Sequence, residues 1–481
     1  MEIFCASIFA RFVYKRTILI RNGSIETTTI HARSKDKVAK ITMLLSKLDY
    51  CPPLYCIFEY HGQLQTAFQF TIRNVLRLCK SIVFKSNSTV FSRELLVLPD
   101  GGSIALDWAA QHGSSSPLLE HDSPIVILHH GLVGDSQSEY IYHLSHSLLK
   151  SGCRVVVLVA RGCGGLQLTS PELFAGRRVS DIAHCVDKVR EYFPSAKLFL
   201  MGFSLGAALS LQYLAENHDE VLRRSHAGEI HPNPNDPNNK LSAENPLTAA
   251  LCVSPPWDIN RNYTFIASLW LMLLVIPMKL HYLQHREFLN AADPERFKNM
   301  TLWNLLWCRN MSQFDALVCS SHYKASGGRY TSLSEYYEDI SPIHSAHRIL
   351  TPTIVLTARD DPLIAHDCAP QQPSELGPGL VVVSSPHFFI YLVVIVAASD
   401  VKYYYYIVDV MYTLEYLYMY ILYDCLGEDT LWRTSSVSPH CGTQLHSLVG
   451  PRGASMVWFF SIDIAIAGYF SKQYIFQTVY F

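Results

Sequence analysis

The segment from Lys197 to Glu216 reads KLFLMGFSLGAALSLQYLAE and carries the strongest fold signal in the chain. Its first part, Lys197 to Met201, is a short apolar run typical of a buried strand, and Ala207 to Glu216 has the composition of a helix. Between them lies the pentapeptide Gly202-Phe203-Ser204-Leu205-Gly206, a G-x-S-x-G sequence. A tight strand-to-helix turn holds the serine of such a sequence in a sparsely populated backbone conformation and exposes its hydroxyl. The pattern therefore predicts a nucleophile at Ser204, with Gly202 and Gly206 as the elbow glycines.

A series of apolar runs through the middle of the chain predicts a buried, mostly parallel sheet. Several runs consist almost wholly of β-branched and aliphatic residues, as strands covered by helices on both faces do. Helical segments alternate with them, which indicates an α/β doubly wound fold. The first two strands are expected to pair as an antiparallel hairpin, because Pro99 to Ser103 has strong turn chemistry. The expected strands are Glu94–Leu98, Ile104–Trp108, Pro124–His129, Arg154–Val159, Lys197–Met201, Thr248–Val253 and Thr353–Thr357, and the expected helices are Tyr140–Lys150, Val179–Tyr192 and Ala207–Glu216.

Two segments interrupt this alternation. From Leu222 to Pro246 the chain is polar and contains NPNDPNNK, which predicts a surface insertion without chemistry. From Pro255 to about Ser341 the strand pattern stops and aromatic-rich helical stretches follow, including Phe265 to Met278. That stretch is too short to span a membrane, and Pro277 lies near its end. We therefore expect a helical cap packed over the sheet.

Composition narrows the class of protein. The chain has 39 Lys and Arg against 41 Asp and Glu, with no long basic block, so the electrostatic footprint of a nucleic-acid-binding protein is missing. The 13 cysteines are scattered, and Cys51 and Cys56 have no second pair at zinc-ligand spacing. The expectation is reduced, buried thiols in a cytosol-facing protein, with no metal and no cofactor. Met1 to Val13 is apolar but interrupted by Arg11, which supports neither a signal peptide nor a spanning helix.

A second chemical signal lies upstream of the elbow, in the sequence HHGLVGD from His129 to Asp135. A serine that attacks an ester carbonyl creates an oxyanion, which two backbone N–H groups must stabilise. One donor comes from the residue after the nucleophile and one from the loop after an earlier strand, so Leu205 and Leu132 are the predicted donors. The alternative interpretation of this segment is an ordinary turn at the end of a strand.

Several motifs, in the same order along the chain, resemble those of the alpha/beta-hydrolase superfamily, specifically AB hydrolase subfamily four. This branch contains membrane-associated phospholipase-like and acylglycerol-lipase-like proteins and fungal medium-chain ester synthases. The resemblance spans roughly Leu48 to Val383 and implies an alpha/beta-hydrolase fold with a helical cap and a serine esterase or lipase activity. The motifs that carry it are His61–Thr66 (HGQLQT), His130–Leu132 (HGL), Arg161–Gly165 (RGCGG), Phe174–Gly176 (FAG), Ser334–Tyr337 (SEYY) and Ser341-Pro342.

The RGCGG segment follows a predicted strand, so it forms a loop at the catalytic edge together with His130 and Gly131. Gly162 and Gly164 let the backbone turn close to the site, and Arg161 is expected to anchor the loop through several hydrogen bonds. Cys163 is interpreted as a small buried residue, because neither a partner base nor a cause of a low pKa is visible near it.

The acid and the base of a catalytic triad are predicted after the last clear strand. The resemblance favours Asp361, next to Pro362, over Asp360 as the acid that orients an imidazole. Where the branch carries Gly-Gly-His, this chain reads Ser384-Ser385-Pro386-His387, followed by bulky apolar residues. His387 is the candidate general base, but the sequence favours the hypothesis that no base is correctly placed.

The expected division is a poorly matched segment 1–47, a hydrolase core 48–254 with the insertion 222–246, a cap 255–341, a second core part 342–387 and a tyrosine-rich tail 388–481. Our hypothesis for this tail is a splice difference or read-through near His387, and a membrane-associating tail is the competing hypothesis. The predicted function is a serine esterase or lipase that forms an acyl-enzyme at Ser204 on lipid acyl esters, with a membrane surface as a possible partner. The alternatives are a catalytically impaired binding or scaffold protein and an alcohol acyltransferase.

Overall fold

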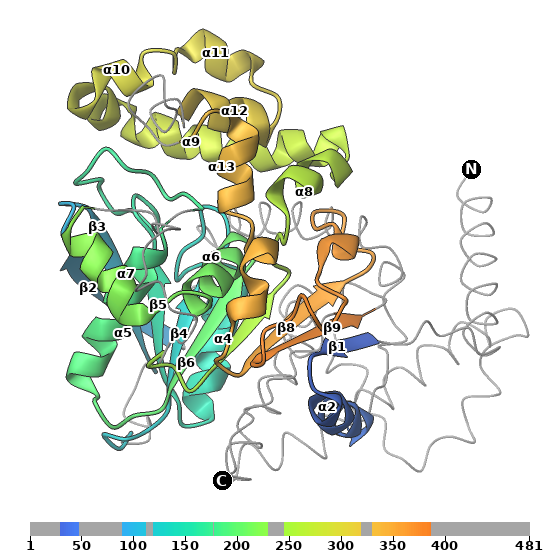
Figure 1. Cartoon of the computed structure of the whole chain (residues 1–481). Helices are drawn as coiled ribbons and strands as arrows, with labels where there is room; N and C mark the ends of the chain where they lie inside the picture. The colour runs from blue at the N-terminus through green and yellow to red at the C-terminus, as the bar shows by residue number, and fades with distance from the viewer. Residues whose placement is uncertain are drawn as a thin grey trace, which may run out of the picture. The chain divides into compact units, whose positions relative to one another are not determined.

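The computed structural model describes residues 29–47, 89–111, 119–176, 178–228, 245–318 and 330–385. Their strands form one nine-stranded sheet in the order β1-β9-β8-β7-β6-β4-β5-β3-β2 (Figure 1). The strands are β1 (Thr29–Ala32), β2 (Thr89–Val97), β3 (Ser103–Gln111), β4 (Ile125–His129), β5 (Arg154–Val159), β6 (Leu198–Phe203), β7 (Ala249–Val253), β8 (Thr353–Ala358) and β9 (Leu380–Ser385).

The middle of the sheet is parallel and its two ends are antiparallel. Strands β5, β4, β6, β7, β8 and β9 pair in parallel, whereas β3 pairs with β5, β2 with β3, and β1 with β9 in antiparallel fashion. Every residue of β4 and β8 is buried, which explains why these strands have continuous apolar sequences. The mostly parallel sheet and the β2–β3 hairpin predicted from the sequence are both confirmed.

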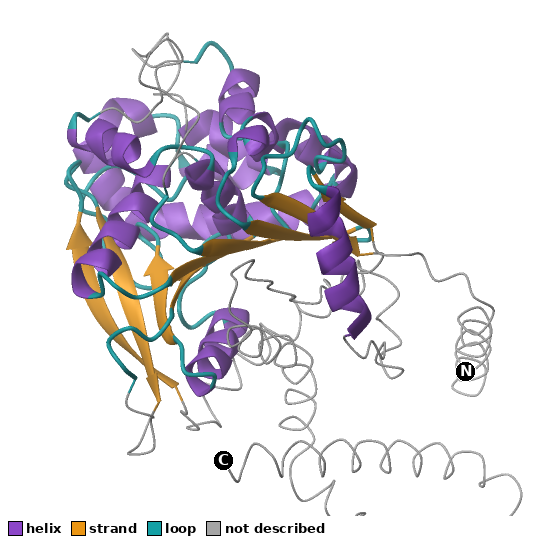
Figure 2. Cartoon of the chain, turned by 60° about the horizontal axis from the view of Figure 1, so that its bottom comes forward, coloured by secondary structure: helices purple, strands orange, loops and turns teal. Residues whose placement is uncertain are grey.

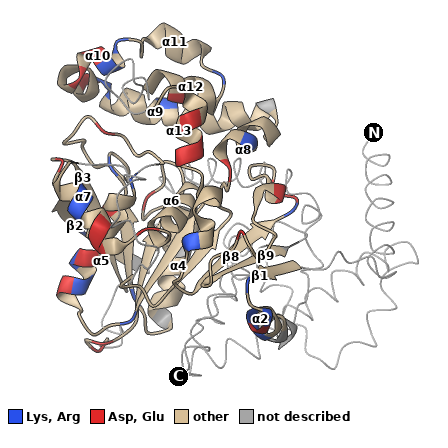
Figure 3. Ribbon diagram, viewed as in Figure 1, with Lys and Arg blue, Asp and Glu red and all other residues tan. Residues whose placement is uncertain are grey.

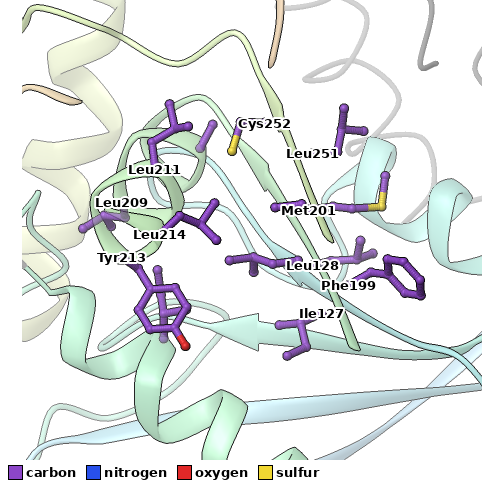
Figure 4. Close-up of a cluster of buried hydrophobic side chains, with 14 of the residues drawn as sticks. Ile127, Leu128, Phe199, Met201, Leu209, Leu211, Tyr213, Leu214, Leu251 and Cys252 are labelled. Atoms are coloured by element: carbon purple, nitrogen blue, oxygen red, sulfur yellow. The ribbon is translucent and has the colours of Figure 1, made fainter. Parts of the chain in front are cut away.

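Helices lie on both faces of the sheet (Figures 1 and 2). Figure 4 shows apolar side chains of α6, among them Leu211 and Leu214, together with those of the neighbouring strands, among them Leu128 of β4 and Met201 of β6. These side chains belong to the main core cluster, and all four are at most 4% exposed. The helices outside the cap are α2 (Lys35–Lys47), α4 (Glu139–Lys150), α5 (Val179–Tyr192), α6 (Leu205–Leu214) and α7 (His218–His226).

A helical cap is inserted between β7 and β8 and lies over one end of the sheet (Figure 1). Its buried side chains form a second cluster that also contains Leu168 and Leu173 of the core, so the cap is packed onto the core. The described helices of the cap are α8 (Ile259–Phe265), α9 (Ser268–Ala292), α10 (Pro294–Phe297), α11 (Leu302–Trp307), α12 (Met311–Val318) and α13 (Leu333–Asp339). Short 3-10 turns follow at Pro342–His344, Ala346–Arg348 and His366–Cys368.

One helix of the cap differs from the sequence-based expectation. The helical stretch expected to stop near Met278 instead continues as α9 to Ala292, with Pro277 inside it. A proline removes one backbone donor from a helix. Val275 before the proline and Tyr282 after it both bury themselves in the same apolar cluster, and this packing offsets the lost hydrogen bond. Among the described residues, no helix is long and apolar enough to cross a membrane.

Two other segments contain structure that the sequence did not suggest. The expected polar insertion begins within helix α7, whose first turn is capped by Asn217 accepting from the Glu220 N–H at 3.1 Å. Residues 229–244 of that insertion lie outside the described residues. In the poorly matched N-terminal segment, β1 extends the sheet edge by pairing with β9. The HGQLQT motif, His387 and the tyrosine-rich tail also lie outside the described residues.

Candidate active site

Ser204 lies on the turn between β6 and α6 in a strained backbone conformation, with φ 52° and ψ −119°. Residues other than glycine rarely adopt positive φ, and such strain is typical of functional sites. The backbone holds the turn in place, because the Ser204 N–H donates to Val253 O at 2.9 Å and Ser204 O accepts from the Ala208 N–H at 3.0 Å. Its side chain is exposed. A serine hydroxyl is thus presented to solvent at the carboxyl end of a central strand.

The two elbow glycines are required by close packing. A Cβ added to Gly202 would lie 2.6 Å from Ser210 Oγ and 2.7 Å from Ala207 Cα. A Cβ added to Gly206 would lie 2.3 Å from the carbonyl oxygen of His130. The glycine spacing around Ser204 therefore lets α6 start directly against β6 and against the end of β4.

The loop after β4 reaches the elbow because of the sheet register. His129 of β4 is the partner of Gly202 on β6, so the chain beyond His129 runs beside the serine. A Cβ added to Gly131 would lie 3.3 Å from Ser204 Cβ. The N–H groups of Leu132 and Leu205 donate to no acceptor among the described residues. Leu205 is also the first residue of α6, where the helix dipole favours negative charge.

Gly131 itself is held at both of its backbone polar atoms. Its N–H donates to the Tyr140 hydroxyl at 2.9 Å, and its carbonyl oxygen lies 2.7 Å from His130 Nδ1. The other ring nitrogen of His130 accepts from the Ala160 N–H at 3.1 Å. Burial lowers the pKa of His130, which favours a neutral ring. With both ring nitrogens engaged, His130 is not free to act as a general base.

The RGCGG loop lies between the core and the cap. Arg161 is 2% exposed, and its guanidinium contacts Asp181 at 2.8 Å and Asp100 at 2.6 Å. Gly162 and Gly164 have φ of 68° and 55°, in the left-handed region that favours glycine. The carbonyl oxygen of Gly162 lies 2.9 Å from Nε2 of His285 on α9, so the cap contacts this loop directly.

Cys163, in the same loop, is 1% exposed, and burial raises the pKa of its thiol. A thiol with a raised pKa is a poor nucleophile at neutral pH. The described cysteines are likewise free and buried. Within the described ranges no cluster of His, Cys, Asp or Glu is arranged to hold a metal ion. Figure 3 shows Lys and Arg interspersed with Asp and Glu along the described ribbon.

Asp361 follows β8 and is 2% exposed. Burial raises its pKa to about 7, against the opposing effect of hydrogen bonds from the Leu363 N–H and the Ser254 side chain. The Leu363 bond to Asp361 Oδ1 is 2.9 Å long. The neighbouring Asp360 is only half-buried. Both carboxyl oxygens of Asp360 are nevertheless buried, so burial alone does not separate the two carboxyls. Asp361 is distinguished by its hydrogen bonds with Leu363 and Ser254 at the end of the sheet.

Ser254 is a site residue that the sequence reasoning missed. It follows β7 with φ 49°, and its N–H donates to Leu356 O on β8 at 2.8 Å. Its side chain contacts Asp361, as given above. Its place after a predicted strand and before Pro255 was the only available signal. The hydrogen bonds from Ser204 to Val253 and from Ser254 to Leu356 place the ends of β6, β7 and β8 side by side, so that Ser204, Ser254 and Asp361 share one edge of the sheet.

A central parallel sheet, a serine on a strained strand-to-helix turn and a helical insertion before the last strands define the class of alpha/beta hydrolases. The chain belongs to the alpha/beta hydrolase fold family, whose family model matches residues 124–392.

Known proteins with related sequences carry lipase and phospholipase names. The chain is 29% identical over 263 residues to a monoacylglycerol lipase of Saccharomyces cerevisiae, covering 53% of this chain and 52% of the relative. It is 24% identical over 343 residues to phospholipase ABHD3 of Mus musculus, covering 69% of this chain and 70% of the relative. It is 27% identical over 332 residues to monoacylglycerol lipase ABHD2 of Mus musculus, covering 67% of this chain and 68% of the relative. The chain thus spans about half the length of the yeast relative.

Proposed function

We propose that this protein hydrolyses acyl esters of lipids through a covalent acyl-enzyme at Ser204. The observation that carries the proposal is the exposed Ser204 at φ 52° on the strand-to-helix turn. It is supported by the Leu132 and Leu205 N–H groups, which donate to no acceptor among the described residues. The names of the relatives, two monoacylglycerol lipases and one phospholipase, support lipid esters as the substrate class. The apolar side chains of the cap beside Leu132 and Val133 supply a wall suited to an acyl chain.

The chemistry follows from the placement of these groups. Ser204 Oγ attacks the ester carbonyl carbon, and the carbonyl oxygen becomes an oxyanion that accepts hydrogen bonds from the Leu132 and Leu205 N–H groups. The proton of the serine passes to a general base and then to the leaving alcohol. Water attacks the acyl-enzyme in the second half of the reaction and releases the fatty acid. Asp361 is the group that would orient an imidazole base.

The test is covalent labelling with an alkyl fluorophosphonate, with the modified residue located by mass spectrometry. We expect the label on Ser204 and none on Ser204→Ala, together with release of fatty acid from a monoacylglycerol by the unmodified protein. Folding of the variant is checked by circular dichroism. Label on another residue, or undiminished hydrolysis by Ser204→Ala, would remove Ser204 from the reaction.

A catalytically impaired binding or scaffold protein is the second candidate. It is favoured by one observation, the sequence SSPH at 384–387 in place of Gly-Gly-His, since His387 is the only candidate base near the expected position. Binding of a fatty acid or of an uncleavable ether analogue of a monoacylglycerol, without label on Ser204, distinguishes this candidate from the enzyme. An alcohol acyltransferase would instead label at Ser204 and form a new ester when ethanol is added.

A membrane surface is the partner we propose for the cap. Helix α11 turns Leu302, Trp303, Leu306 and Trp307 outward, each more than half exposed, while Leu305 anchors the helix in the cap cluster. The guanidinium of Arg309 lies 5.6 Å from the centre of the Trp307 ring. Tryptophan and arginine together suit the interface between water and lipid.

Vesicle sedimentation tests this partner with the double variant Trp303→Ser, Trp307→Ser. We expect the variant to lose binding to phosphatidylcholine vesicles with some phosphatidylserine, while Ser204 is still labelled as in the unmodified protein. Equal sedimentation of both proteins would show that α11 does not mediate membrane contact.

A further inference from the structure

The oxyanion loop is fixed by a side chain that lies outside it, Tyr140 in the first turn of α4. The hydroxyl oxygen of Tyr140 accepts the Gly131 N–H at 2.9 Å. The Tyr140 ring packs against Phe203, the residue immediately before Ser204, with ring centres 5.1 Å apart. One side chain therefore contacts both the loop that carries the Leu132 donor and the strand that carries the nucleophile.

The carbonyl side of Gly131 is fixed independently. His130 Nδ1 lies 2.7 Å from Gly131 O, and the Gly134 N–H donates to the same oxygen at 3.1 Å. A carbonyl oxygen only accepts, so the His130 ring must carry its proton on Nδ1. His130 Nε2 accepts from the Ala160 N–H at 3.1 Å, which requires that nitrogen to be unprotonated. The two bonds together specify one neutral tautomer.

Fixing this carbonyl also orients the next amide. The atoms of a trans peptide unit are coplanar, and its C=O and N–H point in opposite directions. The Gly131 carbonyl is directed toward His130 Nδ1 and the Gly134 N–H, so the Leu132 N–H points in the opposite direction within the same peptide plane. A reversed plane would present a carbonyl oxygen, which repels an oxyanion, in place of the donor.

Hydrogen bonds fix the start of α4 relative to this loop. Ser138, the residue before the helix, donates its N–H to Asp135 O at 3.2 Å, and its Oγ accepts from the Asp135 N–H at 3.0 Å. Ser136 Oγ donates to the buried Asp107 at 2.6 Å. The turn between Gly131 and Tyr140 is therefore tied to β3, which gives the Tyr140 hydroxyl a fixed position.

We propose that Tyr140 and His130 are positioning residues that set the orientation and spacing of the Leu132 N–H relative to Leu205 and Ser204. The proposal rests on the esterase function proposed above. In this proposal the Tyr140 hydroxyl sets the distance between the oxyanion loop and Ser204. The Nδ1–H tautomer of His130 sets the direction of the Leu132 N–H. Neither side chain takes a proton from Ser204.

The first experiment measures the rate at which an alkyl fluorophosphonate modifies Ser204 in Tyr140→Phe. The matched control is Tyr142→Phe, which also loses a tyrosine hydroxyl from α4. The Tyr142 ring packs against Phe91, with ring centres 6.3 Å apart. We expect the maximal rate in Tyr140→Phe to fall about 10-fold or more, since a full oxyanion donor contributes about 10²–10³-fold. The probe concentration for half-maximal rate should stay unchanged. A serine hydrolase that has lost its general base keeps a residual rate that comes from oxyanion stabilisation. The comparison of the two variants therefore does not depend on which residue is the base.

The second experiment separates the two ring nitrogens of His130. Asn places an amide near the position of Nδ1, and Gln places one near Nε2. His130→Asn keeps a donor for Gly131 O, and we expect it to label Ser204 several-fold faster than His130→Gln at equal thermal stability. The ¹⁵N spectrum of histidine-labelled protein should show His130 as the Nδ1–H tautomer from pH 6 to 8, a readout that needs no catalytic activity.

The outcomes separate this proposal from the proposed function. If the unmodified protein labels at Ser204 while Tyr140→Phe matches Tyr142→Phe in rate, the positioning role is wrong and the esterase function stands. If Ser204 takes no label at all, the esterase function is wrong. The measured tautomer of His130 then still tests the proposed geometry of the loop. An Nε2–H tautomer or a charged His130 ring overturns the positioning proposal in either case.

Discussion

His129 on β4 and Gly202 on β6 are register partners in neighbouring parallel strands. This pairing brings the end of β4 against the turn that carries Ser204, and Gly206 then lies against the carbonyl groups of His129 and His130. The oxyanion loop and the nucleophile are separated by about seventy residues of sequence, but the sheet register alone places them side by side.

Replacing Ser204 separates its chemical role from its backbone strain. Ser204→Ala should abolish esterase activity with little change in stability, because the exposed hydroxyl leaves no buried partner unsatisfied. Ser204→Gly should also be inactive but more stable than Ser204→Ala by about 1–2 kcal/mol, since glycine relieves the strain at φ 52°. Urea unfolding of both variants measures this difference. Equal stabilities would show that the turn is not strained.

Gly206→Ala tests the contact between α6 and the oxyanion loop. The added methyl would lie 2.3 Å from His130 O and 2.6 Å from His129 O, so the loop or the helix must move. We expect a loss of unfolding free energy above about 2 kcal/mol, together with loss of labelling at Ser204.

The control for this substitution is Gly101→Ala, in an open hairpin turn at φ 76° with no atom within 4 Å of the added Cβ. It should cost only about 1 kcal/mol for the unfavourable φ and leave labelling intact. If Gly206→Ala is as mild as this control in urea unfolding, the close approach of α6 to the loop is wrong.

Within the acidic pair, Asp361→Asn should reduce turnover by orders of magnitude and Asp360→Asn by much less. The Asp361 carboxyl accepts a hydrogen bond from the Leu363 N–H at 2.9 Å at the end of the sheet, and only the carboxyl that faces an imidazole sets its tautomer. Turnover of a short acyl ester is the measurement. A larger loss in Asp360→Asn would reverse the assignment.

Stability should depend on pH through Asp361. Its folded pKa is raised to about 7 by burial, whereas the unfolded pKa is about 3.9. Between these values the folded state holds a proton that the unfolded state has released, so stability decreases as pH rises. Relative to Asp361→Asn, the protein should lose on the order of 4 kcal/mol from pH 4 to 8. Urea unfolding of both proteins across this range gives the difference. A flat difference would indicate a cationic partner at Asp361, as an imidazolium would be.

The general base can be tested by exchanging the tail. Phe388, Phe389 and Ile390 favour continuation of an apolar strand, and His387 lacks the flexible glycines that the resembling branch has. If the break after Val383 removed the base, the chain as it stands should resist labelling at Ser204. Replacing the residues after Val383 with Gly-Gly-His and the usual C-terminal helix of the branch should restore fast labelling.

The contrary result for the base is equally definite. Fast labelling of the unmodified chain that disappears in His387→Ala would identify His387 as the base. The matched substitution His366→Ala, at a half-buried residue in the turn after Asp361, should leave fast labelling unchanged in that case.

Much of the site could be read from local sequence, because each motif carries its own backbone requirement. The strain at Ser204 and the left-handed Gly162 and Gly164 follow from glycine spacing within a few residues. The continuation of α9 through Pro277 could not be read in this way. It depends on whether residues on both sides of the proline share a buried cluster, which is a property of the packed cap.

Local sequence was sufficient to predict the nucleophile turn, the apolar strands and the order of the motifs, since these depend on neighbours along the chain. Three features became visible only in the folded chain: Tyr140 accepts the Gly131 N–H, Ser254 contacts Asp361, and burial raises the pKa of that carboxyl to about 7. The physical reason is that hydrogen-bond partners and desolvation are set by the groups that the sheet register brings together. Those groups lie on different strands and helices, and no local pattern specifies their distance.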